Sequence, residues 1–380
     1  MLSAIPSFFL YAVVGIGTIP IPLILRGMGY SVLQVGFLMS IFELSGHLCP
    51  LVASPALQRY GKYGRVLLAA GIIALVMPVP FVLLRGFGWT ALALGIYALA
   101  PRGSLPCMDS ITTSMIADKP NRYGVVRGIG SLGYVILLVT LQFTTDLGSA
   151  GPAGIIAWMC IPALLLILAV VLVPGVLAVS TGPRKTVRDT SGSTFSGLTP
   201  AFWLGIGLIF CAYLSLSPVN RFLTLYVEED LGLHVAAILY ALSAAVEIPV
   251  MMFSSRLLKH FSAIRVICLC TAAITPRLLV YILFPTLHGQ VAGQMLHCLN
   301  YGLIHPAAIF FVTRNVPKEK LLIGLSIYQL VGYGFANVLG AALGGVIIEN
   351  FGYRALFLFF ATLPPMALGA YCLVRKKVRR

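Results

Sequence analysis

Three side chains in the C-terminal half of the chain can hold or exchange charge within long apolar stretches. Glu247, Arg277 and His297 each stand in a separate hydrophobic run. An ionisable group in such a run is costly unless it is paired, which makes each one a candidate functional residue. A carboxylate whose surroundings change can bind and release a proton. Two alternatives stay open: Glu247 and Arg277 as a purely structural ion pair, and His297 as a satisfied hydrogen-bonding group.

Two further sets of polar residues occur in the N-terminal half. Asp109 precedes Arg127 by 18 residues, and a guanidinium presents a planar fork of donors that suits a carboxylate or a polar solute. The same two residues are also consistent with a permanent salt bridge. Glu43 and His47 are spaced i and i+4, so one helical face carries both, as a second polar contact or an internal hydrogen bond.

The elements that position these residues are predicted to be membrane spans. Of the 380 residues, 59% are hydrophobic and 10% are charged, whereas a soluble domain is about 25% charged. This composition excludes a water-soluble globular protein. The apolar runs are near the ~20 residues that cross a bilayer as a helix, and they are continuous, unlike the alternating strands of a membrane barrel. The predicted fold class is an all-α polytopic membrane protein.

Glycine, proline and charged residues divide the chain into twelve predicted transmembrane helices. We predict an N-terminal six-helix bundle over 1–174, a cytoplasmic linker over 175–200 and a C-terminal six-helix bundle over 201–380. A basic loop follows the second span of each half, so the two bundles are expected to be pseudo-symmetric. The twelve spans are expected near 5–25, 32–54, 66–84, 89–111, 128–146, 152–174, 201–227, 233–254, 266–285, 288–312, 322–347 and 352–374.

The charge pattern predicts how the chain lies in its membrane. The net charge is +15, and the basic residues cluster in alternate loops, while Arg102, Arg221 and Arg277 stay inside or near apolar runs. The positive-inside rule places both termini in the cytoplasm and the chain in the cell inner membrane. The charge therefore reflects topology, and we expect no nucleic-acid partner. The eight cysteines lack metal-ligand spacing and no Walker motif occurs, so we expect no metal, no cofactor and no ATP-driven transport.

The layout and several motifs resemble the major facilitator superfamily of secondary transporters. The loop QRYGKYGR at 58–65 is a degenerate form of that superfamily's G-x-x-x-D-R-x-G-R signature, with Gln58 where the acid is expected. The segment RYGVVRGIGSLGYV at 122–135 is similar to the element that opens the fifth helix in the branch of lactose, phenylpropionate and nucleoside permeases. The Glu, Arg and His of the C-terminal half, on three successive predicted helices, resemble the same branch.

The resemblance implies a solute site and a proton site. In that branch the residues that match Asp109 and Arg127 hold sugar hydroxyls, and the aromatic residue that matches Tyr134 stacks on the sugar ring. The Glu, Arg and His series serves proton coupling. The sequence departs from the branch at Asn300, because the branch has its proton-binding carboxylate at this spacing after the histidine, and an amide cannot release a proton. We count Asn300 among the candidate solute contacts.

These observations predict a secondary transporter and not an enzyme. The expected activity is proton-coupled symport of a small, polar, ring-containing solute by alternating access, with the two halves rocking about a midplane cavity. A sugar or nucleoside is favoured over an aromatic carboxylate, because a free Asp109 carboxylate repels an anion. One alternative is a uniporter or exchanger without proton coupling, which Asn300 favours. A membrane sensor or embedded enzyme is the remote alternative. The expected partners are the solute, protons and the lipid bilayer, and the carrier is expected to be a monomer.

Overall fold

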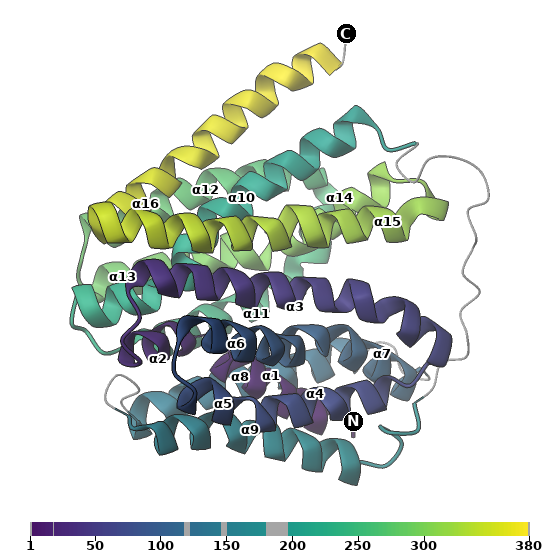
Figure 1. Ribbon diagram of the computed structural model, residues 1–380. Helices are drawn as coiled ribbons and strands as arrows, with labels where there is room; N and C mark the ends of the chain where they lie inside the picture. The colour runs from purple at the N-terminus through teal and green to yellow at the C-terminus, as the bar shows by residue number, and fades with distance from the viewer. Residues whose placement is uncertain (1, 18, 118–121, 146–149, 180–196, 379–380) are drawn as a thin grey trace. The chain divides into compact units, whose positions relative to one another are not determined.

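The computed structural model describes residues 2–17, 19–117, 122–145, 150–179 and 197–378, and within them every regular element is a helix (Figure 1). Residues 180–196 of the predicted linker lie outside the described residues. Each long apolar run forms a helix, in which the backbone N–H and C=O groups bond to one another. In a bilayer, only a helix or a closed barrel satisfies all of these groups. The predicted all-α class is confirmed.

The N-terminal half contains nine helices within the described residues, because three of its six predicted spans are broken. The predicted span 5–25 consists of two helices with Gly17 and Pro20 between them, and the predicted span 66–84 is interrupted before Pro78, which cannot donate a helical hydrogen bond. The nine are α1 Ala4–Ile16, α2 Ile21–Gly27, α3 Val32–Tyr60, α4 Tyr63–Val76, α5 Pro78–Leu83, α6 Phe87–Gly103, α7 Leu105–Met115, α8 Tyr123–Thr144 and α9 Pro152–Leu172.

The C-terminal half is marked by π-helical turns inside its spans. It contains α10 Pro200–Leu225 with the π turn η2 Tyr226–Asp230, α11 Ala236–His260, α12 Ala263–Leu283, α13 Leu287–Met295, the π turn η3 Cys298–Gly302, α14 Ile304–Asn315, the 3₁₀ turn η4 Lys318–Lys320, α15 Leu321–Ile327, the π turn η5 Tyr328–Phe335 and α16 Ala336–Val378. Gly352, at φ 79° and ψ 174°, breaks α16 between the last two predicted spans. We call residues 287–315 the α13–α14 span and residues 321–351 the α15–α16 span.

Eight described helices are long and apolar enough to cross a membrane, and the bent pair α1 and α2 supplies a ninth. Each of the other predicted spans is missing from this count, although helices are present there. Residues 323–375 count once although Gly352 divides them. α6 and α7 are each too short alone, and α11, with 25 residues, begins with the apolar sequence AAILYALSAAVEIPVMMF of the predicted span. The pattern agrees with twelve spans.

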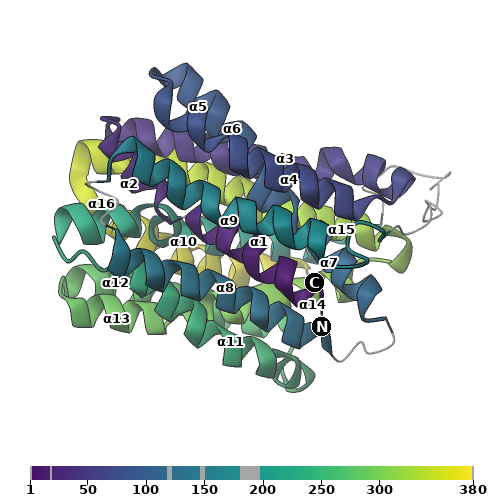
Figure 2. The same cartoon turned by 90° about the horizontal axis from the view of Figure 1, so that it is seen from below.

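The chain divides into two compact units. The first contains residues 1–185 together with 235–241 at the start of α11, and the second contains 186–234 and 242–380. In the first unit α1 packs on α8, α3 on α6, and α4 on α9 (Figure 2). In the second unit α10 packs along α16, and α12 packs against α13 and α16. These contacts bring the polar residues of each unit together.

Candidate functional site

The predicted pair of Asp109 and Arg127 forms and joins α7 to α8. Arg127 Nη1 donates to Asp109 Oδ1 at 3.0 Å, and the Tyr123 hydroxyl donates to the same oxygen at 2.9 Å. The Arg127 guanidinium carbon lies 5.0 Å from the centre of the Tyr11 ring on α1, a cation–π contact. The ion pair uses one nitrogen and one oxygen, so the bidentate arrangement that a guanidinium fork allows is not used here.

The pair keeps free hydrogen-bonding capacity. The side chain of Arg127 is 39% exposed and that of Asp109 is 42% exposed. Among the described residues, Arg127 Nε and Nη2 and Asp109 Oδ2 have no hydrogen-bond partner. An ion pair this open to solvent contributes only about 0–1 kcal/mol to stability. Its unused donors and acceptor suit a solute that carries several hydroxyl groups.

Glycines on α8 allow α1 to approach closely and thereby place Tyr11 over Arg127. A Cβ at Gly133 would collide with the backbone carbonyl of Phe8, and a Cβ at Gly130 would come within 2.7 Å of Tyr11 Cδ2. Only a residue without a side chain fits at these two contacts. The glycine spacing of the 122–135 motif therefore has a packing function next to the ion pair.

Tyr134 lies further along the same side of α8 as Arg127. It follows Arg127 by seven residues, about two turns of α8, so both side chains leave the helix on one side. Its half-buried ring packs on Gly15 of α1, where a Cβ would lie 3.1 Å from Tyr134 Cδ2. A role in stacking on a solute ring stays a prediction.

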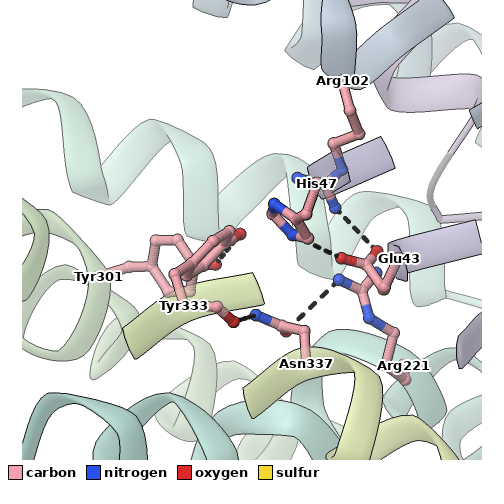
Figure 3. Close-up of polar contacts among 7 residues, drawn as sticks. All are labelled: Glu43, His47, Arg102, Arg221, Tyr301, Tyr333 and Asn337. Carbon is pink, nitrogen blue, oxygen red and sulfur yellow. Dashed lines mark hydrogen bonds and ion pairs between the residues drawn. The ribbon is translucent and has the colours of Figure 1, made fainter. Parts of the chain in front are cut away.

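The Glu43 carboxylate is fully buried and bound from two sides (Figure 3). Arg102 Nη2 on α6 donates to Oε1 at 3.0 Å, and His47 Nε2 on α3 lies 3.1 Å from Oε2. The Arg102 side chain passes over Gly46, where a Cβ would come within 2.7 Å of it. The predicted contact between Glu43 and His47 is present. Arg102 is the partner that sequence reasoning missed, because it stands 59 residues away.

The three candidates of the C-terminal half come together with His297 in the middle. His297 Nε2 lies 3.3 Å from Glu247 Oε2, and its Nδ1 lies 3.2 Å from Arg277 Nη2. Arg277 is completely buried, and it also donates to Gln294 Oε1 at 2.8 Å and to the Tyr281 hydroxyl at 3.3 Å. Glu247 and Arg277, both described residues, have no direct contact, so the plain ion pair considered from the sequence does not form.

This geometry defines the protonation state of the cluster. A guanidinium can only donate, so His297 Nδ1 accepts from Arg277 and carries no proton. The ring proton is therefore on Nε2, which faces the Glu247 carboxylate. A neutral imidazole, one carboxylate and one guanidinium together carry no net charge. The Glu247 carboxylate thus balances the buried charge of Arg277, and the His297 imidazole between them can itself bind a proton.

Asn300 has no contact of the kind expected for a solute ligand. Its side chain is fully buried, and Nδ2 donates to the backbone carbonyl of Cys270 on α12 at 3.0 Å. Its Oδ1 has no partner among the described residues. The amide ties the α13–α14 span to α12, and its predicted role as a solute contact has no support in this geometry.

Aromatic side chains continue from His297 along the α13–α14 span. The Tyr301 ring stacks on the His297 imidazole with centres 5.0 Å apart and planes 7° apart. Its hydroxyl lies 2.7 Å from that of Tyr333 on the α15–α16 span (Figure 3). The ring of Tyr213 on α10 meets the Tyr333 ring edge-on at 4.7 Å. Neither Tyr213 nor Tyr301 is predicted from the sequence as a site residue. Tyr301 lies on the polar face of the α13–α14 span, a spacing that only matters once the neighbouring helices are known, and Tyr213 of α10 has no such signal.

Several polar and aromatic residues of this region lie in two π turns. Asn300 and Tyr301 lie in η3, and Tyr333 lies in η5. A π turn shifts the side chains that follow it around the helix axis, and such turns are frequent at functional sites. Buried Arg221 of α10 is held in the same region: its Nη2 donates to Asn337 Oδ1 at 3.5 Å, and Asn337 Nδ2 donates to the Tyr333 carbonyl at 2.8 Å (Figure 3).

A family model described as the MFS_1 like family matches residues 2–359. The chain belongs to the MFS_1 like family. It is 26% identical over 97% of its length to an uncharacterized transporter, YwbF, of Bacillus subtilis (strain 168), covering 92% of that protein. It is 23% identical over 91% of its length to a maltose permease of Geobacillus stearothermophilus, covering 86% of that permease.

The fold of this family member matches solved transporters. The crystal structure of a mutant form of the nucleoside transporter NupG superposes with a TM-score of 0.83 over 98% of each chain, at 14% identity. At that identity the match shows the fold alone. The predicted major facilitator fold is therefore confirmed, and the chain is a multi-pass membrane transporter of this type and not an enzyme.

Proposed function

We propose that this MFS_1 like transporter is a proton-coupled symporter of a small neutral solute with a ring and several hydroxyls, namely a sugar or a nucleoside. It works by alternating access, as a monomer in the inner membrane with both termini in the cytoplasm. The proton gradient is its energy source, and it uses no cofactor. These statements go beyond the family assignment and rest on the polar residues of the two units.

The observation that carries the proposal is His297 held between Glu247 and Arg277. The cluster has no net charge with a neutral imidazole, and one added proton gives it a charge of plus one beside a guanidinium that is completely buried. Protonation of Nδ1 is incompatible with the hydrogen bond from Arg277. A proton on Nδ1 therefore disrupts a contact between spans, and a proton on Glu247 removes the negative charge that balances Arg277. Either one is the differential interaction that a proton needs to shift a conformational equilibrium.

The solute class follows from the pair of Asp109 and Arg127. Its free donors and its free carboxylate oxygen match hydroxyl groups, and the negative charge of Asp109 disfavours an anionic solute. Tyr11 lies over Arg127, and Tyr134 follows about two turns further along the same side of α8, so both offer aromatic surface on which a ring can pack. Two similar proteins, a maltose permease and a nucleoside transporter, are named for solutes of the same classes.

The first test is binding and proton movement by purified protein. A thermal-shift screen with uridine, adenosine, maltose, lactose and phenylpropionate should give a hit among the neutral compounds, since a ligand at 100 times its Kd stabilises by about 2.7 kcal/mol. Adding the hit to proteoliposomes should then raise the external pH as protons enter with the solute. Binding of phenylpropionate alone would overturn the neutral-solute class. Solute uptake without any pH change would replace symport by the uniporter.

A further inference from the structure

The α13–α14 span carries a polar stripe that extends well beyond the proton cluster. Its members are Gln290, Gln294, His297, Tyr301 and His305. The spacings of four and three residues place Gln290, Gln294 and His297 on one face of α13. The π turn η3 shifts the residues after it around the axis, and the contacts of Tyr301 with His297 and of His305 with Tyr328 continue the stripe. At about 1.5 Å per residue, the 15 residues extend over roughly 22 Å, most of the thickness of a bilayer core. One face of this span thus offers proton-binding or hydrogen-bonding groups from near one end to the other.

The part of the stripe that follows His297 ends in a second histidine. His305 Nδ1 lies 2.6 Å from the hydroxyl of Tyr328, which lies 3.3 Å from the hydroxyl of Tyr213. Both tyrosines are completely buried. The Tyr213 ring also contacts the rings of Tyr301 at 5.8 Å and Tyr333 at 4.7 Å. Hydroxyl groups therefore lead from Tyr301, which stacks on the His297 imidazole, to His305. Two steps of this path need a water molecule: the step from the His297 ring to the Tyr301 hydroxyl, and the step between the two hydroxyl pairs.

Among the described residues, the elements packed against α14 carry one further buried charge near this path, Arg221 of α10, which donates to Asn337 Oδ1 next to Tyr333. The elements packed against α14 are α10, α12, α15, η3 and η5. Towards His305, α10 presents Tyr213 and η5 presents Tyr328, and α15 has no titratable residue. Of the two charged side chains of α12, Arg277 is bound to Gln294 and His297, and Arg265 is exposed. α11 faces Leu303 of the span with apolar residues.

The part of the stripe that precedes His297 has unmet hydrogen-bonding capacity. Gln290 and Gln294 are fully buried, and among the described residues Gln290 Oε1 and Gln294 Nε2 have no partner. Both side chains also contact Tyr281, one through its carbonyl and the other through its hydroxyl. A buried acceptor and a buried donor one helical turn apart suit ordered water, which commonly satisfies such groups. Water at this place connects His297 with the end of the span where α13 begins.

We propose that the polar stripe is the proton path of this carrier and that His305 is a second proton-binding station, on the side of His297 that faces the basic loop at 314–320. The proton leaves Glu247 or His297, passes along the tyrosine hydroxyls and two bridging waters, binds to His305, and is released to water at that end. This inference rests on the proposed symport. It predicts that His305 determines the rate of proton transfer, while the Glu247 cluster determines the number of protons transported with each solute molecule.

The test compares net uptake with exchange in proteoliposomes, using whichever of uridine, maltose and lactose the wild-type protein takes up. In His305→Ala and in Tyr328→Phe, the rate of uptake driven by a pH gradient should fall about tenfold or more, as expected for loss of a proton-transfer group. The final accumulation should be unchanged, and so should the rate of counterflow, which requires no net proton release. Imidazole inside the vesicles should restore the rate of His305→Ala. His288→Ala, an exposed histidine in the same span, should behave as wild type.

The outcomes separate the two proposals. Equal losses of net uptake and counterflow in both variants, or wild-type rates in both, would overturn the role of His305 and leave symport intact. A loss of final accumulation in His305→Ala would contradict a purely kinetic role. A wild-type protein that takes up one of the three solutes with no response to the pH gradient would overturn the proposed symport, and the proton path with it.

Discussion

At the scale of residues, the first unit contains two acidic residues paired with arginine that differ sharply in exposure. The pair of Asp109 and Arg127 is about two-fifths exposed, while Glu43 is completely buried beneath Arg102. Exposure decides what each pair can do, because an open pair contributes little to stability and a buried one is costly to break. We therefore assign solute contact to Asp109 and Arg127, and structural support of α3 against α6 to Glu43 and Arg102.

The first prediction concerns Arg127→Lys. Lysine keeps the positive charge and loses the free Nε and Nη2 donors of the guanidinium fork. A hydrogen bond to a charged group is worth about 1.5–3 kcal/mol, so the Kd for the solute should rise roughly ten- to a hundredfold. Isothermal titration of the purified protein measures it. Arg122→Lys, at an exposed neighbouring position, is the matched control. An unchanged Kd in Arg127→Lys would make the pair structural and place the solute elsewhere.

The second prediction contrasts Glu43→Gln with Asp109→Asn. The first variant leaves Arg102, whose side chain is only 15% exposed, beside an uncharged amide, so the free energy of unfolding should drop by about 3–5 kcal/mol. The second removes a half-open pair and should cost no more than about 1 kcal/mol. Thermal unfolding of both proteins in the same detergent measures the difference. Equal stability of the two variants would refute the division of roles between the pairs.

At the scale of elements, helix contacts and helix irregularities place the functional side chains. Close packing at Gly133 fixes α1 on α8, and the π turns η3 and η5 orient Tyr301 and Tyr333 towards one another. The close packing requires a residue without a side chain, and a π turn replaces regular helix geometry over a few residues. Changes at such positions are expected to affect both stability and binding.

The third prediction uses two glycines of α8. A Cβ at Gly133 meets the Phe8 carbonyl, whereas nothing lies within 4 Å of a Cβ at Gly128. Gly133→Ala should therefore lower stability by about 1–3 kcal/mol, as overpacking typically does, and weaken solute binding because Tyr11 shifts away from Arg127. Gly128→Ala should be neutral or stabilising by up to about 1 kcal/mol. Thermal unfolding and titration of each variant test this, and a harmless Gly133→Ala would contradict the close approach.

The elements themselves could largely be predicted from the sequence, whereas their contacts could not. Hydropathy indicates each span because it reflects burial in lipid, and glycine, proline and charged residues mark where the spans end. The π turns carry no hydropathy signal. The insertion of His297 between Glu247 and Arg277 depends on how three helices are rotated, which a single sequence does not reveal. The sequence shows Arg102 as a charge in an apolar run, but it does not reveal its partner, because Glu43 belongs to another span.

At the scale of the whole molecule, the distribution of basic loops predicts the sidedness of the carrier. Ser262 lies in the described turn between α11 and α12, within a basic loop, and Gly151 lies just before α9, away from one. The positive-inside rule places the first in the cytoplasm and the second outside. The direction of solute and proton movement depends on this orientation.

The fourth prediction tests that orientation. In a background without the eight native cysteines, Gly151→Cys should react with a membrane-impermeant maleimide in intact cells, and Ser262→Cys should react only after the membrane is opened. Labelling is read from the mass of the purified protein. The reverse pattern would invert the topology, and His305 would then lie near the outer surface.

The central claim is that Glu247 and His297 couple solute movement to the proton. Glu247→Gln cannot release a proton and imitates the protonated cluster, so this variant should still bind solute and change conformation. Glu319→Gln, at an exposed acid, is the matched control. The comparison therefore separates coupling from transport as such.

The most direct measurement is solute uptake into proteoliposomes with and without an imposed pH gradient, for wild type and Glu247→Gln. We predict that the wild-type protein and Glu319→Gln accumulate solute only with the gradient. We predict that Glu247→Gln loses accumulation completely and keeps downhill counterflow. Wild-type uptake that ignores the gradient, or gradient-driven accumulation that persists in Glu247→Gln, would contradict the assignment of proton coupling to this cluster.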